Sequence, residues 1–75
     1  MKAYVLVNTS PGKVGDIARQ ITGISGVTMA NACWGMPDIF VVAEVGNSEE
    51  LKKLVIEKIS ALEGVERTET HNAIE

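Results

Sequence analysis

Few residues of this 75-residue chain could take part in catalysis or hold a metal. Cys33 is the only thiol and His71 the only imidazole, too few for a closed zinc site with four Cys or His ligands. No serine or cysteine stands in a motif with a histidine, and no glycine-rich phosphate-binding motif occurs. We therefore expect no catalytic residue, no metal and no cofactor.

Residues Trp34-Gly35-Met36-Pro37-Asp38 are the best candidate for a binding loop. Glycine permits unusual backbone angles and proline fixes φ, so the segment predicts a turn. Such a turn can offer backbone N–H groups to an anion, and Asp38 can accept hydrogen bonds from a cation. A structural interpretation also holds, in which Gly35 shapes the turn and Asp38 caps it. Trp34 either anchors an interface or packs within the hairpin.

The first half of the chain predicts strand, helix, strand. Residues 3–7 are apolar and rich in β-branched types, typical of a buried strand. We expect Ser10 to cap a helix, Pro11 to take its first position and Gly23 to end it in a left-handed cap. One face of that helix is apolar and consists of Val14, Ile17, Ala18 and Ile21. Residues 27–33 form a more polar strand.

The second half repeats this order. Residues 39–45 are the most hydrophobic strand, and Asn47 or Ser48 begins the next helix. Asn47 with Glu50 resembles a capping box. The apolar stripe of this helix consists of Leu51, Leu54, Val55, Ile59 and Leu62. The last strand, residues 65–73, is mostly polar.

The two halves share a glycine–valine pair at the start of their last strand, at Gly26-Val27 and Gly64-Val65. Two such halves with right-handed crossovers predict one domain over residues 1–75 with the α+β, ferredoxin-like βαββαβ fold. The expected antiparallel sheet has the order 4-1-3-2 and carries both helices on one face. The apolar strands are then central and the polar strands are edges.

This sheet has one face that its helices do not cover. Side chains alternate along a strand, so Tyr4, Leu6, Phe40 and Val42 point to the uncovered face. Burying each is worth roughly 1.5–3 kcal/mol, which together approaches the ~5–15 kcal/mol stability of a domain. Single exposed apolar residues are common, but we favour a second chain, arranged as a two-fold dimer. These four residues and Trp34 are the predicted interface.

The formal net charge of −3 and the scattered lysines and arginines disfavour direct binding to nucleic acid. No apolar run approaches the ~20 residues that span a membrane. The amino terminus lacks the layout of a signal peptide. We expect a cytoplasmic protein without a membrane partner.

Several motifs occur together in one order: Pro11-Gly12 after the first strand, Gly26-Val27, the turn 35–38, and residues 64–70. This series resembles the effector-binding (RAM) domain of the Lrp/AsnC transcription regulators, over essentially the whole chain. The resemblance implies dimers through sheet faces, as in a dimeric α+β barrel, and rings of dimers such as octamers. It also implies small effectors, usually amino acids, bound in clefts between dimers.

The resemblance implies a set of effector-binding residues: Gly35, Met36, Asp38, Thr68 and Thr70. Gly35 and Asp38 match the Gly-x-x-Asp turn of the family, and Thr68 and Thr70 match its Thr-x-Thr strand. The threonines are equally well explained as ordinary β-branched residues of an edge strand. Pro37 departs from the aromatic residue that is common in relatives, so the ligand is expected to differ or to be absent.

Full-length members also carry an amino-terminal helix-turn-helix, and nothing precedes Met1 to supply it. We expect a stand-alone effector domain that affects transcription by sensing a ligand or by co-assembling with a full-length Lrp/AsnC regulator. A small dimeric α+β-barrel enzyme, with His71 or Asp38 as its base, is the alternative from another class. An ACT-like regulatory domain is the third.

Overall fold

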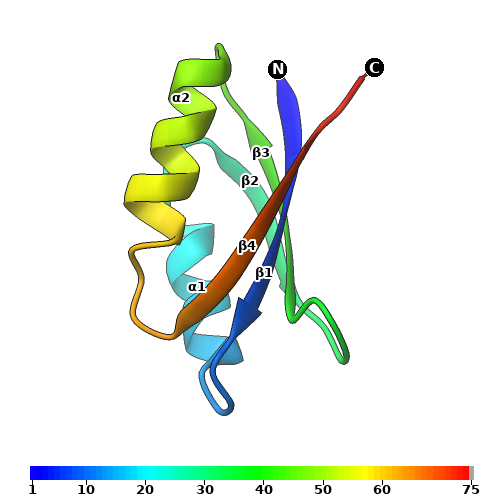
Figure 1. Ribbon diagram of the computed structural model, residues 1–75, viewed down its shortest axis with the longest axis vertical. Helices are drawn as coiled ribbons and strands as arrows, with labels where there is room; N and C mark the ends of the chain where they lie inside the picture. The colour runs from blue at the N-terminus through cyan, green and yellow to red at the C-terminus, as the bar shows by residue number, and fades with distance from the viewer. Residues whose placement is uncertain (75) are drawn as a thin grey trace.

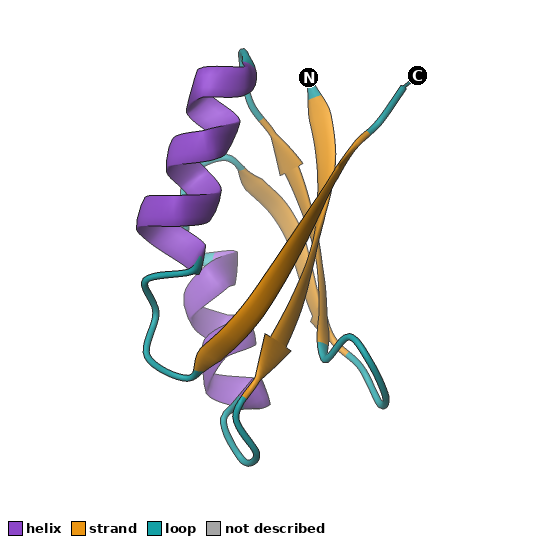
Figure 2. Ribbon diagram, in the orientation of Figure 1, coloured by secondary structure: helices purple, strands orange, loops and turns teal. Residues whose placement is uncertain are grey.

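The computed structural model describes residues 1–74, which form one antiparallel sheet with all helical segments on one face (Figures 1 and 2). The sheet order is β2-β3-β1-β4, identical to the predicted 4-1-3-2. Within these residues no helix is long and apolar enough to cross a membrane. The elements are β1 (Lys2–Thr9), α1 (Val14–Thr22), β2 (Val27–Ala32), β3 (Ile39–Glu44), α2 (Ser48–Lys53), η1 (Leu54–Ile59) and β4 (Val65–Asn72).

The core lies between the sheet and the helices. Strand β1 pairs with both β3 and β4, and Val5 lies opposite Val41 in the centre of the sheet. Alternate residues of the two central strands are fully buried, as their β-branched sequences predict. The largest side chains that are almost completely buried are Ile17, Ile21, Ile39, Ile59, Val5, Val7 and Val41.

The glycine–valine repeat is visible in the backbone. Gly26 and Gly64 have φ angles of 97° and 100°, and each is followed by the valine that begins a strand. Only glycine adopts this left-handed conformation without strain. At Gly64 a Cβ atom would also lie 2.9 Å from Ile17 Cδ1. The starts of β2 and β4 are therefore structurally equivalent, as predicted.

The predicted start of the first helix was wrong. Helix α1 begins at Val14, and the residues from Ser10 to Gly12 form a turn. The backbone N–H of Ser10 donates to the carbonyl of Gly64, the residue before β4, at 2.8 Å. This bond holds Ser10 beside β4, and Ser10 does not cap α1. The carbonyl of Ser10 accepts from Lys13 at 3.1 Å and closes the turn. Pro11 therefore does not take the first helical position.

The predicted left-handed cap at Gly23 was also wrong. Gly23 has φ −83°, an ordinary right-handed value. Its N–H donates to the carbonyl of Gln20 at 3.2 Å, which continues the last turn of α1. The reversal into β2 occurs three residues later, at Gly26.

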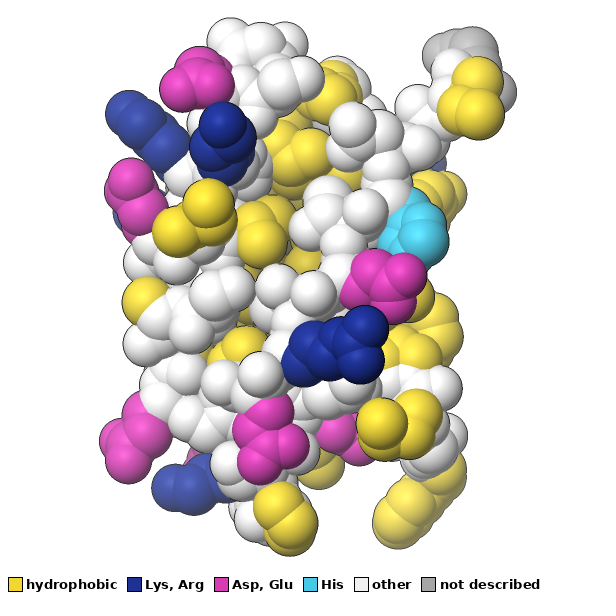
Figure 3. Space-filling view, in the orientation of Figure 1, with side chains coloured by type: hydrophobic (Ala, Val, Ile, Leu, Met, Phe, Trp, Pro, Cys, Tyr) yellow, Lys and Arg dark blue, Asp and Glu magenta, His cyan; other side chains and the backbone are white. Residues whose placement is uncertain are grey.

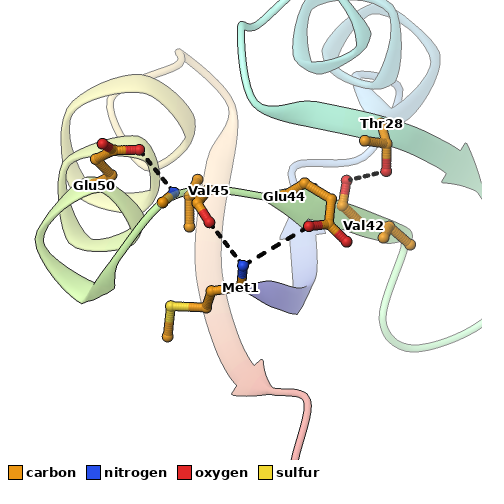
Figure 4. Close-up of polar contacts among 7 residues, drawn as sticks. Met1, Thr28, Val42, Glu44, Val45 and Glu50 are labelled. Atoms are coloured by element: carbon orange, nitrogen blue, oxygen red, sulfur yellow. Dashed lines mark hydrogen bonds and ion pairs between the residues drawn. The ribbon is translucent and has the colours of Figure 1, made fainter. Parts of the chain in front are cut away.

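The second helix begins with the predicted cap. Asn47 accepts a hydrogen bond from the backbone N–H of Glu50 at 2.9 Å. The Glu50 carboxylate accepts from the N–H of Gly46, also at 2.9 Å (Figure 4). In a usual capping box the acidic side chain accepts from the backbone N–H of the cap residue itself. Here Glu50 accepts from Gly46, the residue before the cap. From Leu54 the helix continues as a π-helical segment, which the sequence analysis did not predict.

The amino terminus is fixed beside the start of α2. The Met1 ammonium donates to the Val45 carbonyl at 2.9 Å and lies 3.9 Å from the Glu44 carboxylate (Figure 4). On the other side of β3, the Thr28 hydroxyl donates to the Val42 carbonyl at 3.2 Å. These bonds join Met1, just before β1, and Thr28 of β2 to the end of β3 that leads into α2.

Candidate functional site

The face of the sheet opposite the helices is uncovered, and its middle, on β1, β2 and β3, is largely apolar. We call it the open face; it carries Tyr4 and Leu6 of β1, Phe40 and Val42 of β3, and Met29 of β2. Tyr4, Phe40 and Met29 are 42%, 45% and 49% exposed, although each lies within a strand of the sheet. The register aligns Met29, Val42 and Tyr4 in one row across three strands. The predicted uncovered face is therefore present in the structure.

Trp34 lies away from this face. It is fully exposed, at 103% of its reference area, so it does not pack within the hairpin. It borders a shallow depression with Val14, Ala32 and Cys33, and Val14 belongs to α1 on the helix side. Of the predicted interface residues, the other four share the open face and Trp34 does not.

A small cavity lies where the open face meets the β2–β3 turn. Its volume is about 200 Å³. Strand β1, the turn and strand β4 contribute its lining, which consists of Leu6, Asn8, Met36, Pro37, Arg67, Thr68 and Glu69. The cavity therefore combines an apolar wall with an amide, a guanidinium and a carboxylate.

The polar groups of this cavity are incompletely paired. Asn8 Oδ1 is buried and accepts no hydrogen bond from any group in residues 1–74. Arg67 is exposed and takes part in none of the ion pairs found among the described residues. Glu69 Oε2 lies 3.2 Å from His71 Nε2. A free acceptor beside a free guanidinium can hold a molecule that has both a donor and a carboxylate.

The structure brings together some of the predicted effector-binding residues. Met36 and Thr68 line the cavity. Gly35 precedes Met36 in the turn and has φ 101°, so the turn requires glycine there. Asp38 is already engaged: its Oδ2 accepts from the Thr9 N–H at 2.8 Å, and its own N–H donates to the Val7 carbonyl at 2.9 Å. This carboxylate therefore fixes the turn against β1.

The two threonines point to the helix side of β4. The register places Thr68 opposite Val7 and Thr70 opposite Val5, both of which face the core. Thr68 Oγ1 lies 3.4 Å from Ser60 Oγ. Thr70 lines a different hollow, between β4 and the second helix. The threonines share a face, as predicted, but Thr70 does not line the cavity at the turn.

Three lining residues were missed by the sequence analysis: Asn8, Arg67 and Glu69. Asn8 continues the alternation of Tyr4 and Leu6 onto the open face. Arg67 lies opposite Asn8, and Glu69 lies opposite Leu6. Extending the alternation of β1 by one further outward position, from Leu6 to Asn8, and pairing β4 with β1 would have identified all three residues.

We expect Asp38→Ala to lower the free energy of unfolding by about 1–3 kcal/mol. The Thr9 N–H would lose its acceptor, and Thr9 is only 8% exposed. Asp38→Asn keeps an acceptor oxygen and should lose clearly less. Urea denaturation of the three proteins checks this; a loss below about 0.5 kcal/mol for Asp38→Ala, the range of ordinary surface substitutions, would contradict the structural role of Asp38.

Known proteins share this architecture and its sequence pattern. The family model of the Lrp/AsnC ligand binding domain matches residues 2–75. The chain belongs to this family. A crystal structure of TTHA0845 from Thermus thermophilus has a TM-score of 0.93 and 31% identity, covering 99% of this Lrp/AsnC domain and 92% of that chain.

Two further relatives of this Lrp/AsnC domain are longer. An uncharacterized HTH-type transcriptional regulator of Pyrococcus furiosus is 29% identical over 68 residues, 91% of this chain and 46% of the relative. The present chain thus spans less than half of the curated relatives it matches. The L-Met complex of the regulator NMB0573 from Neisseria meningitidis shares the fold, with a TM-score of 0.87 and 17% identity over 99% of this chain and 49% of that one.

The family match favours a ligand-binding domain of regulators over the enzyme and ACT-like alternatives. The geometry of this Lrp/AsnC domain agrees. His71 pairs with Glu69 and Asp38 with Thr9, and neither His71 nor Asp38 lines the cavity at the turn.

Proposed function

We propose that this Lrp/AsnC domain binds one small amino acid in the cavity at the β2–β3 turn and self-associates through its open face. It would then modulate transcription indirectly, by sensing that effector or by co-assembling with a full-length Lrp/AsnC regulator. The observation that carries the proposal is the buried, unpaired Asn8 Oδ1 beside Arg67.

An unpaired buried acceptor is unfavourable, at a cost of about 1–3 kcal/mol, and such atoms are rare in folded proteins. A rotation of the Asn8 side chain would bring its buried Oδ1 to the cavity, where the ammonium group of an amino acid would supply the missing donor and make a second contact to Glu69. The guanidinium of Arg67 would pair with the carboxylate of the ligand. All three ligand-binding groups belong to the lining of the same cavity.

The cavity also limits the size of the ligand. Its volume of about 200 Å³ is below the roughly 300–1,000 Å³ of sites for drug-sized molecules, and suits a single amino acid. Leu6, Met36 and Pro37 would surround the ligand's side chain. In this proposal Gly35 and Met36 approach from the turn and Asp38 positions the turn, while Thr68 contributes its backbone, because its side chain points to the helix side. The L-Met complex of the Neisseria protein supports the ligand class.

Self-association would cover the open face. Its apolar side chains come from three neighbouring strands, and a two-fold axis would bring the same patch of a second copy against them. The cavity lies at the border of this face, so a covering chain would also shield the ligand from water. Dimers of this kind are the units from which a larger ring, such as an octamer, would be built.

Calorimetric titration of the protein with each of the twenty amino acids tests the effector proposal. We expect one amino acid, or a few of related shape, to bind at millimolar concentration or below. Arg67→Ala should abolish this binding, whereas Arg19→Ala, the same change on an exposed residue of α1, should leave it intact. Asn8→Leu should abolish binding and raise the stability of the free protein, because it removes the unpaired acceptor.

The proposal fails in either of two outcomes. In one, none of the twenty amino acids binds at millimolar concentration. In the other, the Arg67→Ala and Arg19→Ala variants bind the same amino acid equally well, which would place the ligand elsewhere.

A further inference from the structure

A second hollow lies at the end of the sheet away from the β2–β3 turn, between the second helix and the start of β2. Its volume is about 570 Å³. Its lining includes Ser25 and Gly26 before β2, Glu44 at the end of β3, and Lys53 and Lys58 of the second helix. We call it the lysine hollow. It shares no residue with the cavity at the turn or with the hollow between β4 and the second helix.

The irregular geometry of the second helix explains how both lysines reach one hollow. Lys53 and Lys58 are five residues apart. In a regular α-helix with 3.6 residues per turn, side chains five apart point about 140° away from each other. The π-helical segment Leu54–Ile59 begins directly after Lys53. Its hydrogen bonds join residues five apart, so this spacing is close to one turn. Such segments are frequent at functional sites.

The two carboxylates of the lysine hollow already have partners. Glu50 accepts from the N–H of Gly46 at 2.9 Å, and the Glu44 carboxylate lies 3.9 Å from the Met1 ammonium (Figure 4). Neither lysine of the hollow takes part in an ion pair found among residues 1–74. Figure 3 shows basic and acidic side chains gathered over the second helix, at the upper left. The charges left without a partner in the hollow are therefore positive, which favours an anion.

The turn that leads into β2 adds backbone donors to the same hollow. The N–H groups of Ser25 and Gly26 donate to no backbone carbonyl within the described residues 1–74. Gly26 has φ 97°, and an added Cβ would lie 3.6 Å from Val45 Cγ1. Glycine therefore keeps the backbone uncovered at this point of the lining. Successive N–H groups in such a turn form a concavity that suits an anion.

We propose that the lysine hollow binds the phosphate group of a small phosphorylated molecule. A phosphate monoester carries about −1.5 to −2 charge at pH 7 and three strong acceptor oxygens. Two ammonium groups and two backbone N–H groups match it in charge and in number of donors. A carboxylate has one charge and two oxygens and would use fewer of these donors. The volume lies within the roughly 300–1,000 Å³ of small-molecule sites, which leaves room for the organic part beside Val45.

This site goes beyond the proposed function, because its ligand differs in chemistry from an amino acid and its lining is separate. The domain would then respond to two kinds of small molecule, one at each end of the sheet. The phosphate site depends neither on the amino-acid cavity nor on the open-face dimer, so each proposal can fail alone.

Calorimetric titration with inorganic phosphate and with acetate, at low ionic strength to limit screening, tests the ligand class. We expect inorganic phosphate to bind at millimolar concentration or below, and acetate to bind much more weakly. Lys53→Gln and Lys58→Gln should each weaken phosphate binding by roughly tenfold or more, the effect of losing a charge-assisted hydrogen bond. Lys52→Gln is the matched control: it removes the same charge from the adjacent residue, which lines the hollow on the β4 side, and should bind phosphate as the wild type does. All three lysines are exposed, so the variants should fold.

Amide NMR spectra recorded during the phosphate titration locate the bound anion. The signals of Ser25 and Gly26 should shift, whereas those of Gly35 and Met36, at the far end of the sheet, should stay in place. Phosphate that does not bind, or that binds equally to Lys53→Gln and Lys52→Gln, would overturn the site. Acetate binding as tight as phosphate binding would overturn the ligand class. Shifts confined to Gly35 and Met36 would place the anion at the turn and refute the lysine hollow. None of these results depends on whether an amino acid binds at the turn.

Discussion

Phe40→Lys is expected to convert the proposed open-face dimer to single chains at micromolar concentration. Phe40 lies in the centre of the open face, opposite Leu6 of β1 and Asn31 of β2. A lysine there places a charge where two apolar faces meet, and an interface hot spot typically costs about 2 kcal/mol or more to remove. With repulsion between two symmetric lysines added, we expect the dissociation constant to rise by about a hundredfold or more.

Sedimentation equilibrium over a wide concentration range measures this change. Phe40 is 45% exposed in the single chain, so the fold should survive, and circular dichroism would verify it. Ile74→Lys introduces the same charge at an isoleucine outside the open face and should leave the dimer unchanged. A Phe40→Lys protein that dimerises as tightly as the Ile74→Lys control would contradict the open face as the interface.

The strand order was predictable because the central strands differ in composition from the edges. Residues 3–7 and 39–45 carry apolar side chains on both faces, and β1 and β3 are the inner strands. The two glycine–valine pairs marked positions that require a left-handed backbone, Gly26 and Gly64. Both signals are local and need no knowledge of tertiary contacts.

The start of α1 was not predictable from the same kind of signal. Ser10-Pro11 is a good helix start in isolation. The bond from Ser10 to Gly64 joins residues 54 positions apart, and Glu66 accepts from the Ser10 hydroxyl at 3.3 Å. Tertiary contacts with the beginning of β4 therefore outweighed the local preference.

The candidate site was only partly predictable, for a related reason. The turn at Gly35 and Met36 and the strand position of Thr68 followed from sequence motifs. The pairing state of Asn8 Oδ1 depends on what surrounds it in space, and no pattern in the sequence reports that. Thr70 lines the hollow between β4 and the second helix. Its strand position was predictable, but the hollow that it lines depends on how the second helix packs against β4.

Effector and assembly should influence one another in this arrangement. Leu6 belongs to both the open face, where the proposed dimer would form, and the cavity. A ligand that orders this side chain would bind differently to single chains and to dimers. Linkage then requires the reciprocal effect: the factor by which assembly changes the affinity for the ligand equals the factor by which the ligand changes the assembly constant.

The second helix shows how a side-chain spacing can select a backbone geometry. Leu54 and Ile59 are 5% and 0% exposed and stand five residues apart. In a regular α-helix, positions three or four apart share a face, so five residues would rotate one of the pair out of the core. The π-helical segment Leu54–Ile59 brings both inward, and the Ser60 N–H donates to the Val55 carbonyl at 2.8 Å.

Ile59→Ala is therefore expected to be among the most destabilising single changes in the chain. Ile59 is fully buried against the core, and removing a buried isoleucine side chain costs about 2–5 kcal/mol, with part of that cost due to the cavity left behind. Such a loss is a large fraction of the ~5–15 kcal/mol stability of a domain. The π-helical segment would also lose the contact that its geometry serves.

Ile56→Ala is the matched control, because it deletes the same atoms from the same segment at a side chain that is 59% exposed. We expect it to change the free energy of unfolding by less than about 1 kcal/mol, as is usual for exposed positions. Urea denaturation should compare both variants at one protein concentration at which they sediment as the same species, because assembly adds to apparent stability. Similar losses for the two variants would mean that Ile59 is not packed in the core, and that the π-helical segment does not serve to bury it.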